Sequence, residues 1–211
     1  MKRGRFITVE GIEGVGKSSN IEVLVREIES AGYEVLTTRE PGGTPVAEDI
    51  RKLLMDRGDE PIPEIAELLL MFAARSLNVN NVILPAVNSG KWVICDRFSD
   101  SSRAYQGGGR GIPLETIDQL ADWVHGDITP DVTILLDAPV DIGMARASKR
   151  GKPDRIESEK HDFFQRVREC YLQLAEREPQ RFVLIDTTRS LQEVQADVAK
   201  LAQQLVADSS Q

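Results

Sequence analysis

The sequence predicts an α/β domain in which helices flank a parallel sheet of five strands. Apolar runs rich in β-branched residues recur five times, and helical patterns lie between them. The runs are nearly continuous rather than alternating, as expected for strands that are buried on both faces. Alternation of strands and helices favours a parallel sheet, with ligands bound at the carboxyl ends of the strands. The predicted strands are residues 5–9, 34–38, 92–95, 132–137 and 182–186.

The helices are predicted from apolar stripes with a spacing of three and four residues. The clearest stripes run through residues 21–28, 164–174 and 191–205. The last of them opens with a capping box, in which Ser190 and Glu193 satisfy each other's backbone N–H groups. No internal repeat and no linker rich in Pro, Gly or Ser divides the sequence, so residues 1–211 are predicted to form a single domain.

Composition excludes several classes of protein. The chain is 41% apolar and 28% charged, which is typical of a soluble globular protein. No uninterrupted apolar run reaches the ~18 residues of a membrane span, and the N-terminal apolar stretch is too short for a signal peptide. Cys95 and Cys170 form no disulfide framework, and Cys95 is expected to pack as a small hydrophobe. We therefore expect a cytoplasmic protein with no membrane partner.

The net charge of −8 leaves no overall positive field for nucleic acid. Any anion must therefore bind at local clusters of Arg, Lys and backbone N–H groups. Nucleic acid is excluded as an expected partner. The position of each basic cluster then indicates where a smaller anion could bind.

The stretch "EGIEGVGKSSN" predicts a phosphate-binding loop. Its pattern follows the first strand and opens the first helix, which is the context that such a loop requires. Glycines let consecutive N–H groups point at one anion, and the helix N-terminus adds partial positive charge. Lys17 is expected to reach the β- and γ-phosphates of ATP, and Ser18 to offer its hydroxyl to Mg²⁺. The predicted ATP-binding residues are Gly11, Ile12, Glu13, Gly14, Val15, Gly16, Lys17, Ser18 and Ser19.

A carboxylate that coordinates magnesium is expected at the end of another strand. Asp96 follows the apolar run "WVIC", and Asp137 ends the run "VTILLD". Asp96 is the preferred metal ligand, because Arg97 follows it and would place a cation beside the transferred phosphoryl group. Asp137 is an alternative, although Asp is common in turns at strand ends.

Two further motifs suggest a second substrate. In "LLLMFAARS", Phe72 and Arg75 lie three residues apart on a helix, and a ring beside a guanidinium suits a planar base. Helix statistics alone favour a core role for Phe72 and a surface role for Arg75. The segment 96–111, "DRFSDSSRAYQGGGRG", could be an ordinary glycine-rich loop, but its many hydrogen-bond donors favour a pocket for a monophosphate and a base.

The basic segment 146–160, "RASKRGKPDRIESEK", is predicted to be a short mobile lid. A solvated run of charges is the usual interpretation of such a segment. Here it follows the fourth strand and its helix, where it could fold over a triphosphate. Lids of this kind supply arginines and exclude water from the reaction.

These motifs resemble those of the bacterial thymidylate kinases over nearly the whole chain. The resemblance rests on "EGIEGVGKSS", "TREPGGTP", "FAAR", "DRFSDSSRAYQGGGRG" and "DRIE" followed by "FF", in the order of the family. It implies a P-loop NTPase-type fold and transfer of the γ-phosphoryl group of MgATP to dTMP, giving ADP and dTDP for dTTP synthesis. It also implies a homodimer.

The resemblance assigns residues to the phosphate and sugar of dTMP. Arg51 and Arg97 match arginines that grip the dTMP phosphate. Glu40 matches an acid near the sugar and the metal site. Tyr105 matches a tyrosine that packs against the deoxyribose and leaves little room for a 2′-hydroxyl group.

The resemblance assigns other residues to the base. Phe72 matches the ring that stacks on thymine, and Arg75 the arginine that bonds a base carbonyl. Ser102 falls where the family bonds the pyrimidine edge, and Gln106 lies nearby. Asn78 departs from the family, in which a His is frequent at this position.

The lid supplies the candidate catalytic arginines, Arg146, Arg150 and Arg155, in addition to Lys17 and Arg97. Some family members carry an arginine inside the phosphate loop, whereas the only cation in this loop is Lys17. Because charge on the transferred phosphoryl group requires more than one lysine, the lid must supply another cation. Arg150 is the first choice, and Arg150→Ala is expected to lower kcat by about a hundredfold.

Two alternatives remain at the level of the sequence. Another nucleoside monophosphate kinase would share the fold, but the pattern of Phe72, Arg75, Ser102 and Tyr105 argues against it. A nucleotide-dependent switch would need no acceptor pocket, so segment 96–111 would have no purpose in it.

Overall fold

The computed structural model describes residues 3–56, 60–150 and 154–209, without the side chain of Arg150. Its five strands form one sheet in the order β2-β3-β1-β4-β5, and every pair is parallel. The predicted sheet is therefore confirmed, with boundaries that differ by at most one residue. The strands are β1 (Phe6–Glu10), β2 (Val35–Arg39), β3 (Trp92–Asp96), β4 (Val132–Asp137) and β5 (Phe182–Asp186).

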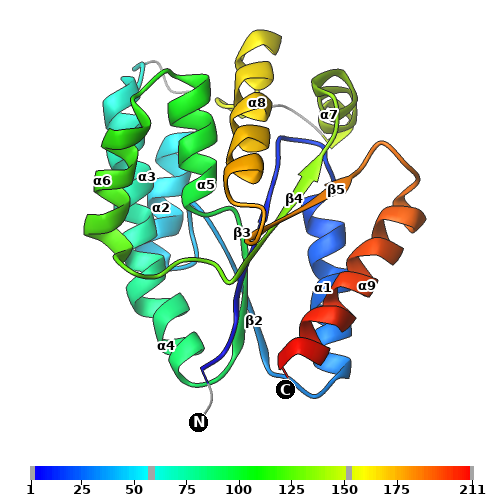
Figure 1. Ribbon diagram of the computed structural model, residues 1–211. Coiled ribbons are helices and arrows are strands. Elements are labelled where there is room, and N and C mark those ends of the chain that lie inside the picture. Colours follow the sequence, from blue (N-terminus) through cyan, green and yellow to red (C-terminus); the bar gives the residue numbers. More distant parts are fainter. Residues whose placement is uncertain (1–2, 57–59, 151–153, 210–211) are drawn as a thin grey trace.

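Helices cover both faces of the sheet (Figure 1). On one face α1 packs along α9, and on the other α8 packs against the π-helical segment η2. Most of the remaining helices lie on the same side as α8 (Figure 1). The α-helices are α1 (Lys17–Ser30), α2 (Pro45–Met55), α3 (Glu64–Asn78), α4 (Leu84–Asn88), α5 (Ser99–Ser102), α6 (Leu114–His125), α7 (Val140–Ala147), α8 (His161–Arg177) and α9 (Leu191–Ser209). The segments η1 (Val79–Ile83) and η2 (Arg103–Gly109) are π-helical, and η3 (Ser148–Arg150) is a 3₁₀ turn.

The central strand β1 is buried along its whole length because it lies between β3 and β4. In this register Val9 lies opposite Asp96 of β3, and Arg39 of β2 lies opposite the same residue. The carboxyl ends of three strands therefore meet at one edge of the sheet, where parallel α/β sheets bind their ligands. Glu10, Arg39 and Asp96 are the last residues of these strands.

The predicted apolar stripes form the core. Phe164, Val167, Tyr171 and Leu174 on α8 are all at most 5% exposed, so this stripe faces inward. The capping box at the start of α9 is also present. The Ser190 N–H donates to Glu193 Oε2 at 3.0 Å, and the Glu193 N–H donates to Ser190 Oγ at 3.3 Å. Cys95 is fully buried, as expected for a residue that packs as a hydrophobe.

One helical stretch, Glu64–Asn88, is long and apolar enough to cross a membrane by length and hydropathy. It comprises α3, η1 and α4, and it carries Glu67, Arg75 and Asn78, which are buried against polar partners within the fold. Such bonded polar side chains are typical of a core helix in a folded domain. Val79 and Ile83 of η1 pack in a core cluster with β3 residues, which places the stretch against the sheet.

Candidate active site

The phosphate loop connects β1 to α1 through three glycines in the left-handed region of φ. Gly11, Gly14 and Gly16 have φ values of 131°, 78° and 90°. A Cβ atom on Gly14 would lie 1.9 Å from the backbone oxygen of Gly143. The loop therefore needs glycine for both its conformation and its close approach to α7. Ser19 Oγ and Asn20 Nδ2 donate to the Gly16 carbonyl oxygen at 3.0 and 2.9 Å, which fixes the start of α1.

Lys17 folds back over this loop. Its Nζ donates to the backbone oxygens of Gly11 and Ile12, both at 3.1 Å. Burial, together with the charge of Arg97, lowers the pKa of Lys17 to about 8. The lysine is thus a partly buried cation held against the glycine-rich loop, which is the arrangement that a bound polyphosphate would stabilise.

Asp96 lies at the end of β3 with a buried Oδ1 atom that has no partner among the described residues. It lines the same cavity as Lys17 and Ser18. Asp137, the alternative metal ligand, does not line this cavity and is instead held by Arg168 through two hydrogen bonds of 2.7 and 2.8 Å. A carboxylate oxygen and a hydroxyl suit Mg²⁺, which binds few protein ligands when phosphates supply the others.

Arg97 occupies the junction between the loop and the cavity. It is the only non-glycine residue with positive φ (70°) in the described part of the chain. Its Nη1 donates to the Gly11 carbonyl at 3.0 Å, and its Nη2 pairs with Glu13 at 2.8 Å. Its guanidinium lies 4.8 Å from the ring centre of Tyr105, whose hydroxyl also donates to Glu13 at 2.8 Å. Glu13 therefore binds both side chains and links the loop to η2.

A buried carboxylate, Glu10, is linked to Arg97 through hydrogen bonds to Ser101 and Tyr171. It accepts from the Phe98 N–H at 2.7 Å, from Ser101 Oγ at 2.6 Å and from the Tyr171 hydroxyl at 2.8 Å. Ser101 and Tyr171 in turn each accept from Arg97 at 3.3 Å. Burial, with a contribution from the charge of Asp100, raises the pKa of Glu10 to about 7.

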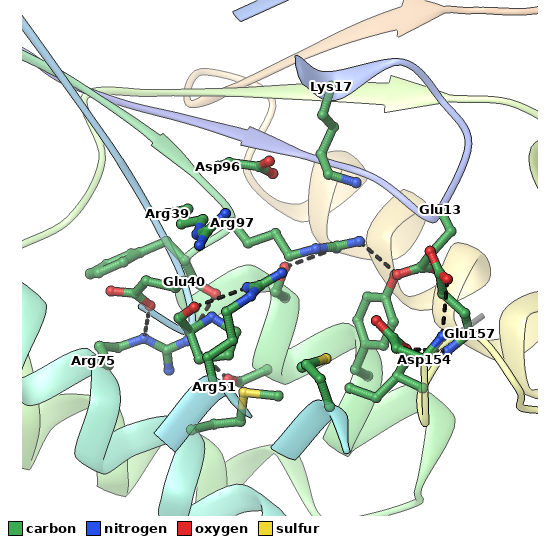
Figure 2. A pocket seen from close by; sticks show the side chains of 18 of the residues that line it. Glu13, Lys17, Arg39, Glu40, Arg51, Arg75, Asp96, Arg97, Asp154 and Glu157 are labelled. Carbon is green, nitrogen blue, oxygen red and sulfur yellow. Dashed lines mark hydrogen bonds and ion pairs between the residues drawn. The ribbon is translucent and has the colours of Figure 1, made fainter. Parts of the chain in front are cut away.

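The main cavity has a volume of about 270 Å³ and lies at the carboxyl end of the sheet. Figure 2 shows Lys17, Asp96 and Arg97 in one part of it, Glu40, Arg51 and Arg75 in another, and the acidic Glu13, Asp154 and Glu157 to one side. The predicted residues that line it are Glu13, Gly14, Gly16, Lys17, Ser18, Glu40, Arg51, Arg75, Asp96, Arg97, Ser102, Tyr105 and Gln106. The fold thus brings together most of the predicted site.

Arg75 is a buried cation in the cavity wall. Its Nε pairs with Glu40 at 2.7 Å, and its Nη2 donates to the Phe98 carbonyl and to Ser102 Oγ, both at 3.0 Å. Its buried Nη1 has no partner among the described residues. Glu40 also accepts from Asn78 Nδ2 at 3.2 Å, so Asn78 belongs to the same buried network. Arg75 therefore keeps one donor free in a fixed orientation.

Phe72 differs from its predicted place. It does not line the main cavity, and it is 2% exposed in an apolar cluster with Leu68, Ile112 and Ile117. The guanidinium of Arg75 lies 4.5 Å from the centre of its ring. The ring thus packs against the guanidinium of Arg75. It is not exposed in the main cavity as a stacking surface, because α3 directs Phe72 toward α6.

Arg155 also differs from its predicted catalytic position. Its Nη2 pairs with the buried carboxylate of Glu67 at 2.6 Å, and its Nε donates to the Leu54 carbonyl at 2.7 Å. It does not line the main cavity, whereas its neighbours Asp154 and Ile156 do. Arg155 therefore connects the lid segment to α2 and α3, and its Nε and Nη2 groups are bonded to protein acceptors instead of to a phosphate.

Arg146 lies at a second cavity of about 250 Å³ on the other side of the phosphate loop. Its Nη1 donates to the Thr187 carbonyl at 2.8 Å. This cavity is lined by Gly14, Val15, Gly16, Asn20, Arg146, Thr187, Arg189, Leu191 and Val194. The position suits contact with one end of a nucleotide but not with a group in the main cavity. Residues 151–153 of the predicted lid and the side chain of Arg150 lie outside the described part of the chain.

Sequence reasoning missed several residues of the site. Glu10 is the first residue of the phosphate-loop motif, and Tyr171 lies in the apolar stripe 164–174. Neither pattern indicates their contacts in the Arg97 network. Met55 lines the main cavity outside every motif, and Met71 and Glu157 line it from within "LLLMFAARS" and "DRIE", where the motifs assign them no role. The position of Glu10 directly before the first loop glycine was a usable signal, whereas the partners of Tyr171 come from distant segments.

Comparisons with known proteins agree with this geometry. The family model described as thymidylate kinase matches residues 9–198. The thymidylate kinase of Ectopseudomonas mendocina (strain ymp) is 50% identical over 203 residues, which cover 96% of this chain and 97% of that protein. The thymidylate kinase of Methylococcus capsulatus is 51% identical over 207 residues, covering 98% and 99%.

A solved structure shares the fold. The crystal structure of thymidylate kinase from Ehrlichia chaffeensis superposes with a TM-score of 0.77 at 34% identity, covering 95% of this chain and 99% of that one. Its fold is of the P-loop NTPase type, as the sequence predicted. Family model, relatives and structure all agree, and the chain therefore belongs to the thymidylate kinase family, whose members phosphorylate dTMP to dTDP with ATP.

Proposed function

We propose that each of the two cavities binds one of the two substrates of the dTMP kinase reaction. The adenosine of ATP binds beside Arg146, the triphosphate lies in the phosphate loop, and dTMP fills the main cavity. The observation that carries this proposal is the position of Gly14 and Gly16, which line both cavities at once. A triphosphate along the loop would therefore reach the main cavity with its γ-phosphoryl group.

In the transfer step, a 5′-phosphate oxygen of dTMP attacks the γ-phosphorus of ATP. A new P–O bond forms while the bond to the β,γ-bridging oxygen breaks, and ADP leaves with that electron pair. Lys17 is proposed to hold the β- and γ-phosphates. Arg97 is proposed to hold the dTMP phosphate near them, since its Nη1 is 3.0 Å from the loop carbonyl of Gly11. This geometry would provide proximity and electrostatic stabilisation, which dominate phosphoryl transfer.

Asp96 and Ser18 are proposed to hold Mg²⁺ together with the nucleotide phosphates. The unpartnered Oδ1 of Asp96 and the hydroxyl of Ser18 fit this role. The bound ion would neutralise charge on the β- and γ-phosphates. Lys17 adds a second positive charge beside them.

The remaining dTMP contacts are proposed on the basis of their positions. Arg51, which lines the cavity and donates to the Pro41 carbonyl at 2.9 Å, binds the 5′-phosphate. Arg75 directs its free Nη1 at a carbonyl of the base, with Ser102 beside it. Tyr105 packs on the deoxyribose. Phe72 then acts indirectly, by supporting the guanidinium of Arg75.

The third cation for the transferred phosphoryl group is proposed to be Arg150. Arg146 and Arg155 are already bonded elsewhere, to Thr187 and to Glu67. Removing a donor of this kind lowers kcat by about a hundredfold or more while substrate affinity changes little. Single-turnover kinetics of Arg150→Ala would test this assignment.

We further propose that the protein is a cytoplasmic homodimer that acts on free nucleotides and binds no nucleic acid or membrane. The net charge of −8 and the two buried thiols support the absence of nucleic acid and a reducing compartment. An exposed apolar stripe on α2 and α3 supports the dimer. Its members Val46, Leu53, Ile65 and Leu69 are each more than 50% exposed.

A coupled assay of ADP release with dTMP, dUMP, AMP and CMP as acceptors tests the proposed function. We expect the highest kcat/KM with dTMP and almost no ADP release without an acceptor. Preference for AMP or CMP would assign the chain to another nucleoside monophosphate kinase activity. Slow hydrolysis that no acceptor stimulates would point to a nucleotide switch.

A further inference from the structure

Glu67 on α3 is a buried carboxylate that the proposed reaction does not use. It is 1% exposed and lies outside both cavities. Its Oε1 accepts from Gln106 Nε2 at 2.9 Å and from Arg110 Nε at 3.3 Å. Its Oε2 accepts from Arg110 Nη2 at 3.1 Å and from Arg155 Nη2 at 2.6 Å. Each carboxylate oxygen therefore has two donors.

These donors keep Glu67 ionised. Burial alone would raise the pKa of Glu67, but hydrogen bonds from Arg110, Gln106 and Arg155 outweigh it and hold that pKa below its usual value. An ionised carboxylate can only accept hydrogen bonds. The side-chain amide of Gln106 must therefore face Glu67 with its NH₂ group, and the opposite orientation would place two oxygen atoms in contact.

Gln106 is also a wall of the main cavity, where it is 1% exposed. Because its NH₂ group is bound by Glu67, the carbonyl oxygen is the end of the amide that remains for a ligand. Arg75 lines the same cavity with its free Nη1 donor. A fixed acceptor and a fixed donor complement a pyrimidine edge that presents a ring N–H beside a carbonyl group. Thymine and uracil present this edge, whereas cytosine presents a ring acceptor beside an amino group.

We propose that Glu67 is a positioning residue for pyrimidine selection, which holds the Gln106 amide with its oxygen toward the base and so disfavours cytosine. This proposal rests on binding of dTMP in the main cavity. Glu67 acts through Gln106 and touches no substrate atom. Arg155, which also donates to the Leu54 carbonyl at 2.7 Å, makes the orientation depend on the docked lid segment.

Glu67→Gln tests the proposal with nearly unchanged volume. The new amide keeps one oxygen for the arginines, and its NH₂ group then faces Gln106, whose amide must turn over. We expect the ratio of kcat/KM for dTMP to that for dCMP to fall at least tenfold, since sites built on hydrogen bonds discriminate strongly. The ratio for dTMP to dUMP should stay within twofold, because both bases carry the ring N–H. General damage to the fold would instead lower kcat/KM for all three acceptors by similar factors.

Two further variants isolate the pathway of the effect. Glu159→Gln neutralises another carboxylate partner of Arg110, bonded at 2.6 Å, without touching Gln106, and should leave both acceptor ratios unchanged. In a Gln106→Met background, Glu67→Gln should have no further effect on the dTMP to dCMP ratio. An unchanged ratio in Glu67→Gln, or an equal effect in the Gln106→Met background, would overturn the proposal. Failure of the wild-type protein to use dTMP would instead reject the proposed function.

Discussion

At the scale of single residues, the site contains buried and partly buried charges whose pKa values depart from those of exposed groups. Lys17 and Glu10 lie within the same group of side chains around Arg97, and burial is the largest cause of both shifts. Their shifts have opposite signs in pKa but the same origin, since low-dielectric surroundings disfavour the charged form of each group. A ligand that supplies the missing counter-charge should reverse the shift of Lys17.

Lys17 is expected to take up a proton when a triphosphate binds at alkaline pH. With a pKa of about 8 it is roughly one-quarter protonated at pH 8.5 in the free protein, and a polyanion beside it favours the charged form. Titration calorimetry with a non-hydrolysable ATP analogue, in buffers of different ionisation enthalpy, should show uptake of about half a proton or more at pH 8.5. Little uptake is expected at pH 6.5, where the lysine is already charged. Undiminished uptake in Lys17→Met would contradict this prediction.

Glu10 is expected to make stability depend on pH in the opposite sense to a surface carboxylate. Its folded pKa of about 7 exceeds the ordinary glutamate pKa of 4.5, so the folded state binds more protons between these values. Its contribution to the free energy of unfolding is fully present below pH 4.5 and is lost as the pH rises through 7. Relative to wild type, Glu10→Gln should therefore gain ~1–3 kcal/mol between pH 5 and pH 8. Urea unfolding at pH 5 and pH 8 measures the free energy of unfolding of both proteins. A stability difference that does not change with pH would refute the prediction.

At the scale of elements, the phosphate loop shows how one position serves two requirements. Gly14 needs both a φ of 78° and the absence of a Cβ atom, which would otherwise lie 1.9 Å from Gly143 O. Gly32 shares only the first requirement, since its φ is 90° and a Cβ atom there meets no atom within 4 Å. The two glycines therefore separate conformational strain from displacement of the loop.

Gly14→Ala is expected to raise the KM for ATP at least tenfold, because the loop must move away from α7 to relieve the clash. Calorimetry should show dTMP binding changed by less than threefold, since its proposed contacts come mainly from other elements. Gly32→Ala is the matched control. It should cost ~1 kcal/mol of stability through strain alone and leave both KM values unchanged. Equal kinetic effects of the two substitutions would disprove the role of the close approach.

The elements were predictable from local patterns, whereas the pairing of side chains was not. Continuous β-branched runs located all five strands, and the loop placed Lys17 and Ser18 correctly at the start of α1. The partners of Arg155 come from α2 and α3, about 90 to 100 residues away in the sequence, so its basic neighbourhood suggested a catalytic role. Glu10 bonds Tyr171, 161 residues away. Local periodicity carries no information about such contacts, because it reports only which face of an element is buried.

At the scale of the whole molecule, α3 has two faces of different character. Its inner face carries Glu67 and Arg75, which are 1% and 2% exposed and belong to the proposed dTMP site or its support. Its outer face carries Ile65 and Leu69, which are 55% and 52% exposed. Buried apolar residues and this apolar outer face together give the helical stretch the hydropathy of a membrane span. Contiguous apolar surface on a soluble protein marks a site of association.

The proposed homodimer should therefore depend on the outer faces of α2 and α3. Sedimentation velocity at micromolar concentration should give a mass near twice the chain mass of 23.4 kDa for the wild-type protein and near the chain mass for Leu69→Asp. A buried unpaired carboxylate at the centre of the interface costs more than the association can offset. Leu184→Asp on β5 is the matched control, since Leu184 is 54% exposed but lies on the strand at the opposite edge of the sheet from β2. It should remain dimeric, and a monomeric wild-type protein, or loss of the dimer in both variants, would exclude this face as the interface.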